Sequence, residues 1–304
     1  MADPFKTDTV KTTQYEVVLK RIRDIPSLPE VVNRIVEIMG NPNTPASQIA
    51  DLISYDPGLT SKVLRMTNSS AYGFQRQISS VQHGIMILGF NTVRGLVLSA
   101  SIFKLFESKK DLKGLDHKIF WQHSISTAII AKLLADELRL TGMDDAFSAG
   151  MLHDIGKIVL DVYFKKQYQE VLEHARHTQQ VAYGSAFHRL EVQLLGAGHT
   201  HIGGYLANKW KLPIAISEVI RFHHHPDKAE NSQVLVHIVA MANELAHYYF
   251  EHFGVFQSDC VSPYLMTYFE EQFAFDAERL EGFYGQIRES LETIDDLLVS
   301  LSDV

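Results

Sequence analysis

The sequence places histidine and aspartate residues where they can hold a metal ion. His153 and Asp154 are adjacent, and His123 lies on an earlier segment. A mixture of imidazole and carboxylate ligands suits divalent ions such as iron, manganese or zinc, which can activate a water for attack on a phosphoester. Lys157, one helical turn beyond His153, can contact an anionic ligand such as a phosphate. If the site supports a reaction, Asp154 and Lys157 are its predicted catalytic residues.

Further candidate ligands lie later in the chain. His199 and His201 occur in the segment GHTHIGG, and the run His223, His224 and His225 stands immediately before Pro226. We expect these residues to contribute to a second ion. Ala242, Asn243 and Glu244 follow on a later predicted helix, and Asn243 is a candidate ligand through its amide oxygen.

The positions of the first ligands restrict where an ion can sit. Adjacent residues of a helix diverge by about 100°, so His153 and Asp154 can share one ion only at a helix edge. Another helix must then supply the opposite ligand. His123 suits this role because it shares a helical face with the apolar residues Ile130, Leu134 and Leu138, and therefore points inward.

Each of these signals also has a purely structural explanation. A buried histidine is more often a hydrogen-bonded core residue than a ligand. The three consecutive histidines are compatible with a solvated loop before a proline, and Lys157 with a side chain that extends to the surface. The hypothesis of a metal site depends on the co-occurrence of these residues, with His153 and Asp154 as its firmest members.

The elements that must position these residues are predicted to be helices, because no segment keeps a two-residue alternation of apolar side chains. In the first part, residues 31–39 follow Pro29 and end at Gly40, and Gly89 separates two further helices. The other predicted starts and spans are Thr44–Pro45, Asp56–Pro57, Ser80–Leu88 and Asn91–Phe106.

The second part begins after a charged linker at residues 107–118. Its first helix spans residues 118–138, and Asp144 is expected to cap the helix leading into LHDIGK, with a bend at Gly156. The later predicted helices are residues 165–178, 183–210, 213–223, 231–252 and a long amphipathic tail, 276–298, capped by Asp276.

These elements predict an all-α fold with two helical parts. The expected boundaries are a flexible N-terminus at 1–14, an N-terminal helical subdomain at 15–108, a second helical subdomain at 109–252 and a C-terminal helical extension at 253–304.

Composition bounds the class of protein. The 304 residues are 46% hydrophobic and 21% charged, and no apolar run approaches the roughly 18 residues that span a bilayer. The polar N-terminus and the single Cys260 favour the reducing cytoplasm. A net charge of -8 disfavours nucleic acid as a partner. The 15 histidines are an unusual enrichment, which a metal site would explain.

Residues 25–226 carry a series of short motifs. They are Ile25-Pro26, Leu28-Pro29, Asp56-Pro57, Leu59, Asn68-Ser69, Tyr72-Gly73, Ile78-Ser79-Ser80, Leu88-Gly89, Phe120-Trp121, His123-Ser124, Phe147, Gly150 to Lys157, Glu191, Leu195-Gly196, His199, Gly203, Trp210, Pro213, His223-His224 and Pro226. Together these motifs resemble the bacterial HDOD (HD-related output domain) family. The resemblance implies a helical fold derived from the HD phosphohydrolase superfamily and a role in signal transduction, often without the catalytic residues.

The sequence is also similar to the metal sites of the HD-GYP phosphodiesterases, which cleave cyclic di-GMP. This similarity implies an ordered ligand set of His123, His153, Asp154, His199, His223 and His224, with Lys157 beside it. Two features depart from that pattern: HPDKAENS replaces the GYP signature, and Asn243 stands where the superfamily has its last aspartate. An amide contributes less charge than a carboxylate and cannot bridge two cations.

Two functional hypotheses follow. The first is a regulatory HDOD module that binds one or two divalent metals without established catalysis and contacts an unknown signalling protein acting in trans, with a phosphate-containing ligand and a homodimer as further expectations. The second is a metal-dependent phosphohydrolase or cyclic-dinucleotide phosphodiesterase. A third possibility is that every histidine is structural.

Overall fold

The computed structural model describes residues 25, 27–39, 44–68, 77–107, 114–177, 184–252, 255–257, 259–292 and 294, and its regular elements within these ranges are helices, with no strand. The predicted all-α fold is therefore confirmed. The expected flexible residues 1–14, the end of a helix at Gly40, most of the linker and the last residues of the tail helix lie outside the described ranges.

The N-terminal helices follow one another closely. They are α2 (Glu30–Met39), α3 (Ala46–Ser54), α4 (Pro57–Thr67), α5 (Val81–Leu88) and α6 (Phe90–Glu107). The later elements are α7 (His117–Glu137), α8 (Ala146–Leu152), α9 (Ile155–Tyr163), α10 (Lys165–His177), α11 (Gly184–Leu195), α12 (His199–Lys209), α13 (Ile214–Phe222), the short 3-10 helix η2 (Pro226–Lys228), α14 (Gln233–Glu251), α15 (Pro263–Phe273) and α16 (Ala277–Leu291).

Side-chain caps fix several helix starts as expected. Asp56 accepts the backbone N–H of Leu59 at 3.0 Å, and Asp276 accepts that of Arg279 at 3.0 Å. The start predicted at Thr44–Pro45 is confirmed because α3 begins at Ala46, while the Thr44 hydroxyl donates to the carbonyl of Ile38 and does not cap the helix. Asp144 is not the cap of α8 either, because Asp145 occupies that position and pairs with Arg94.

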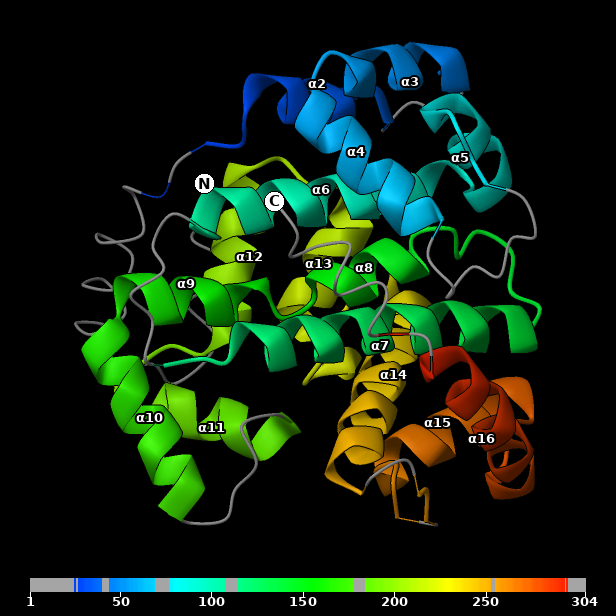
Figure 1. Cartoon of the computed structure of the whole chain (residues 1–304). Coiled ribbons are helices and arrows are strands. Elements are labelled where there is room, and N and C mark those ends of the chain that lie inside the picture. The colour runs from blue at the N-terminus through cyan, green and yellow to red at the C-terminus, as the bar shows by residue number, and fades with distance from the viewer. Residues whose placement is uncertain are drawn as a thin grey trace.

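Helix α6 lies between two hydrophobic clusters. Val93 and Val97 pack with the apolar residues of α2 to α5, whereas Leu96 and Leu98 belong to the larger cluster formed with the later helices. In Figure 1 the N-terminal helices form a layer above α6, and α7, α14, α15 and α16 lie below it. The two sides of one helix therefore complete two neighbouring parts of the core. The domain boundaries expected at residues 108 and 252 remain predictions.

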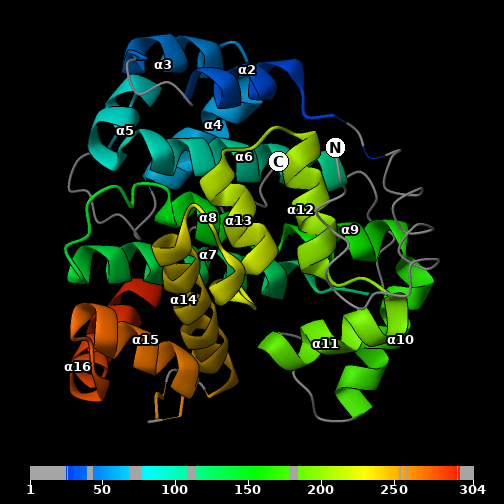
Figure 2. The ribbon, with the colours of Figure 1, turned by 180° about the vertical axis from the view of Figure 1, so that it is seen from behind.

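The larger cluster is built around α7, which packs against α8 and α14. Helix α12 packs against both α9 and α13, and the view from behind shows α12, α13 and α14 next to one another (Figure 2). The ends of α8, α12 and α13 carry the candidate ligands, so this packing determines whether they meet. Within the described ranges, no helix is both long enough and apolar enough to cross a membrane.

Three expectations about these helices need correction. The predicted single helix at 183–210 is two helices, because Gly196 adopts a positive φ of 78° that breaks the chain between α11 and α12. The bend expected at Gly156 falls instead at His153 and Asp154, between α8 and α9. Helix α15 lies within the predicted C-terminal helical extension at 253–304, but it was not predicted as a separate helix.

Candidate metal centre

The carboxylate of Asp154 lies between two groups of histidines. Its Oδ2 atom is 3.3 Å from Nε2 of His153 and 3.6 Å from Nε2 of His123. Its Oδ1 atom is 3.1 Å from Nε2 of His199 and 3.6 Å from Nε2 of His223. Asp154 is only 1% exposed, so these contacts lie in the protein interior.

The first group consists of His123, His153 and Asp154, whose ligand atoms all lie within 4.8 Å of one another. His123 comes from α7, while His153 and Asp154 occupy the junction that ends α8 and begins α9. This break in the helix resolves the problem of the two adjacent residues, because a continuous helix would direct their side chains about 100° apart. The inward orientation predicted for His123 is confirmed.

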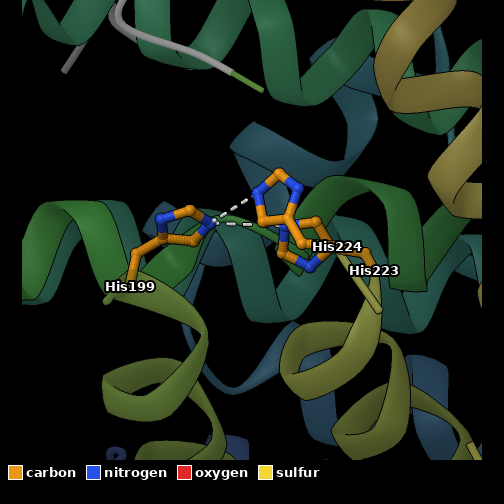
Figure 3. Close-up of side chains that lie close together, drawn as sticks. All are labelled: His199, His223 and His224. Carbon is orange, nitrogen blue, oxygen red and sulfur yellow. Dashed lines mark hydrogen bonds between the residues drawn. The ribbon is translucent and has the colours of Figure 1, made fainter. Parts of the chain in front are cut away.

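The second group consists of His199, His223 and His224, whose ligand atoms also lie within 4.8 Å of one another. His199 is the first residue of α12, and it faces the two histidines that follow α13 (Figure 3). Nε2 of His199 is 3.3 Å from Nε2 of His223 and 3.2 Å from Nε2 of His224. These contacts join two segments that are separate in sequence.

Hydrogen bonds at the other ring nitrogen orient several of these histidines. Glu191 accepts from Nδ1 of His199 at 2.5 Å and from its backbone N–H at 2.8 Å. The carbonyls of Gly150 and Val219 accept from Nδ1 of His153 and His223, at 2.6 Å and 3.0 Å. When Nδ1 carries the proton, Nε2 keeps its lone pair, and such partners are typical of metal-bound histidines.

The donor set fits a divalent cation. Nε2 of His153 and Oδ1 of Asp154 are buried atoms that make no hydrogen bond within the described part of the chain. Two ligands of one cation with bond lengths near 2.1 Å lie about 3.0–3.4 Å apart in octahedral or tetrahedral geometry, and several distances around Asp154 are of this size. His123, His153 and Asp154 can therefore hold one cation, and His199, His223 and His224 can hold another beside the same carboxylate.

Burial favours the neutral form of His123, His223 and His224, whereas the carboxylates of Glu191 and Asp154 outweigh burial at His199 and raise its pKa. Burial lowers the pKa of His123 and His224 well below the usual range, and lowers that of His223 to about 3. Burial alone would raise the pKa of Asp154, but His153, Lys157 and His199 together hold it well below its usual value. A neutral imidazole and an ionised carboxylate are the forms that bind metal ions.

Lys157 is buried rather than extended to the surface. Its side chain is 1% exposed, and its ammonium lies 2.6 Å from Oδ2 of Asp154 and 5.7 Å from the centre of the Phe187 ring. The ammonium therefore stabilises the carboxylate directly. The expected contact between Lys157 and a phosphate remains a prediction.

Comparison with known proteins identifies the fold. A model of the HDOD domain matches residues 25–226, which is well over half of the chain. The chain belongs to the HDOD domain family. An uncharacterized protein of Treponema pallidum (strain Nichols) is 29% identical over 231 residues, a segment that covers 74% of this chain and 43% of the relative. This HDOD chain thus spans less than half of that relative's length.

Solved structures share the HDOD architecture. An HDOD domain protein of unknown function from Geobacter sulfurreducens has 25% sequence identity and a TM-score of 0.76, with 94% of this chain and 97% of that chain covered. A protein from Shewanella amazonensis SB2B, provisionally named a phosphohydrolase, has 24% identity and a TM-score of 0.68, with 91% and 97% covered. At its lower identity, the second likeness shows the fold alone.

Asn243 lies beside the second histidine group of this HDOD protein. It is 3% exposed on α14, and it lines the same cavity as His223 and His224. The remaining predicted histidines lie further out: His201 stacks on His188 with ring centroids 5.9 Å apart, and His225 is exposed. The role of Asn243 as a ligand stays a prediction.

Two residues of α11 were not among the predicted site residues. Glu191 orients His199, and His188 is buried, with Nε2 2.8 Å from the hydroxyl of Thr200 and its ring 5.0 Å from that of His224. A sequence signal existed, because residues three positions apart share one helical face and both side chains are polar on an otherwise apolar stripe. That spacing alone does not say which histidine they support.

Proposed function

We propose that this HDOD protein is a regulatory module of bacterial signal transduction that binds one or two divalent cations at Asp154. The position of Asp154 carries the proposal, because its two oxygens face two separate sets of histidine Nε2 atoms. A partner acting in trans would receive the signal. The family match supports the regulatory part of this proposal.

Each residue of the centre has a definable task. His123 and His153 would hold a cation at Oδ2 of Asp154, and His199, His223 and His224 would hold one at Oδ1. Bound divalent cations supply positive charge that attracts phosphate oxygens and lowers the pKa of water. Glu191 keeps the His199 ring in place, and Lys157 maintains the ionised form of Asp154.

Metal content tests the proposal. Protein purified without an affinity tag or added metal, and then reconstituted anaerobically with iron, manganese or zinc, is analysed by mass spectrometry. We expect near-stoichiometric metal in the wild type and in Asp51→Ala, an exposed control, and less than about a tenth as much in Asp154→Ala. If Asp154→Ala contains as much metal as Asp51→Ala, or if the wild type contains none, the histidine-aspartate centre does not bind a cation.

A metal-dependent phosphohydrolase or cyclic-dinucleotide phosphodiesterase is the second candidate function. The burial of Lys157 beside Asp154 favours it, since a buried cation next to a metal centre can neutralise a phosphate. Hydrolysis of bis-p-nitrophenyl phosphate or cyclic dinucleotides that requires manganese or ferrous iron, and that disappears in Asp154→Ala, would establish it.

A further inference from the structure

A cavity of about 310 Å³ opens beside the second histidine group. His223, His224 and Asn243 line one part of it, and Ser262, Tyr264 and Leu265 line another. The family match ends at residue 226. Ser262, Tyr264 and Leu265 therefore form a second wall of the cavity, and this wall comes from a segment beyond the matched HDOD domain, at the start of α15.

Contacts with α14 hold this wall in place. The Tyr264 hydroxyl is 2.9 Å from Nε2 of His237, whose ring stacks on Tyr268 with centroids 3.6 Å apart. Glu244 accepts the backbone N–H of Ser262 at 2.6 Å. Figures 1 and 2 both show α14 and α15 side by side. The wall is thus anchored to the helix that carries Asn243.

The charges around the cavity are unfavourable for a ligand with several phosphates. Asp227 and Glu244 are lining residues, and the described lining contains neither lysine nor arginine. Phosphates are usually bound through arginine or lysine. The buried Lys157 lies against Asp154 instead and is not part of the lining. One phosphate can be held at the metal centre, but a second phosphate in the cavity would meet carboxylates.

The size of the cavity also disfavours a ligand with several phosphates. Pockets for small organic ligands are about 300–1,000 Å³ in volume, so this cavity lies at the lower end of that range. A cyclic dinucleotide has two nucleosides and two phosphates. The space is suited to a ligand with a single nucleoside-sized group, whose amino or hydroxyl groups can donate hydrogen bonds to Glu244 and Asp227.

We infer that α15 restricts the metal centre to small ligands with one phosphate and a hydrogen-bond-donating organic group, and that it excludes cyclic dinucleotides. This inference rests on the proposed function, because the phosphate is held at the metal centre. Tyr264 is the residue that limits size, and Glu244 is the residue that recognises the organic group.

Calorimetric titration of the manganese-loaded full chain tests the inference, with adenosine monophosphate, inorganic phosphate and cyclic di-GMP as probes. We expect the wild type to bind adenosine monophosphate at least tenfold more tightly than cyclic di-GMP. Glu244→Gln keeps an acceptor for Ser262 and removes the charge, so the affinity for adenosine monophosphate should fall about tenfold while that for inorganic phosphate is unchanged. Glu271→Gln, on the exposed part of α15, is the control.

Tyr264→Ala should raise the affinity for cyclic di-GMP at least fivefold, because it removes a ring that lines the cavity. Tyr264→Phe keeps the ring and should bind cyclic di-GMP like the wild type. Tyr55→Ala should have no effect, because Tyr55 is 79% exposed on another part of the chain. Metal-loaded wild type that binds cyclic di-GMP as tightly as adenosine monophosphate would overturn the inference and leave the proposed function intact. Protein that takes up no metal would overturn the proposed function itself.

Discussion

Glu191 binds His199 twice, through a 2.5 Å contact with Nδ1 and a 2.8 Å hydrogen bond from the backbone N–H. Both contacts use the same carboxylate oxygen, so α11 fixes the first residue of α12 as well as its ring. The orientation of His199 toward Asp154 therefore depends on a residue that need not touch a ligand.

Replacing Glu191 should weaken metal binding without removing a predicted ligand. In Glu191→Gln the neutral amide holds the His199 ring less firmly and no longer makes its Nε2 atom more basic, so we expect metal affinity to fall about 10- to 100-fold. Competition with a chromogenic chelator measures this change. Glu173→Gln, on an exposed face of α10, is the matched control, and an unchanged affinity in Glu191→Gln would argue against an orienting role.

Lys157→Met should lower the stability of the metal-free protein and raise its affinity for metal. The substitution leaves the buried Asp154 carboxylate without its ammonium partner, which destabilises the metal-free protein by about 3–5 kcal/mol. Metal affinity should rise, because the ammonium no longer competes for Oδ2. Thermal unfolding with and without manganese tests both effects, with Lys132→Met as the control for an exposed pair. Equal loss of stability in the metal-free and metal-loaded forms would contradict the prediction.

Titration of His237 is expected to contribute to the pH dependence of protein stability. Burial lowers its pKa, whereas the hydrogen bond to Gln233 and the charge of Asp227 oppose this shift. Below about pH 6.5 the unfolded chain therefore binds the proton more readily than the folded one, and stability falls as the pH decreases. One titrating group can change the free energy of unfolding by at most about 1.4 kcal/mol per pH unit. Urea unfolding of His237→Gln between pH 7 and pH 5 should show a smaller loss than the wild type, and identical slopes would count against this assignment.

Gly156→Ala should damage both the fold and the centre. A Cβ atom there would lie 1.9 Å from the carbonyl oxygen of His199 and 2.9 Å from the backbone nitrogen of Gly203, so α9 and α12 would have to separate. We expect a loss of at least about 2 kcal/mol in the free energy of unfolding. Gly282→Ala has no neighbour within 4 Å in the exposed part of α16 and should be neutral or stabilising by up to about 1 kcal/mol. Chemical denaturation compares the two.

The sequence predicted most helices because their signals are local. Asp56 and Asp276 cap helices through contacts only three residues long, and apolar spacing places His123 on an inward face. Helix α15 was missed although Pro263 stands in its first turn directly after Ser262. It depends on packing against α14 and on contacts such as that between Glu244 and Ser262, which join distant parts of the chain.

The candidate site was predictable in its members but not in its arrangement. Motif order suggested His153, Asp154 and His199, yet it could not show that the two oxygens of Asp154 face different histidine groups. The break between α8 and α9 was predicted too late in the chain, at Gly156, because the apolar pattern continues through His153 and Asp154. Close packing of α9 on α12 at Gly156 is a tertiary effect and has no local signature.

The position of α6 has a consequence for the cooperativity of unfolding. Val93 and Val97 need the N-terminal helices for burial, while Leu96 and Leu98 need the later ones. Loss of either cluster would expose one side of α6 to water and weaken the packing of α8, which ends at His153. A perturbation of the N-terminal helices would therefore reach the metal centre as a change in the population of locally unfolded states.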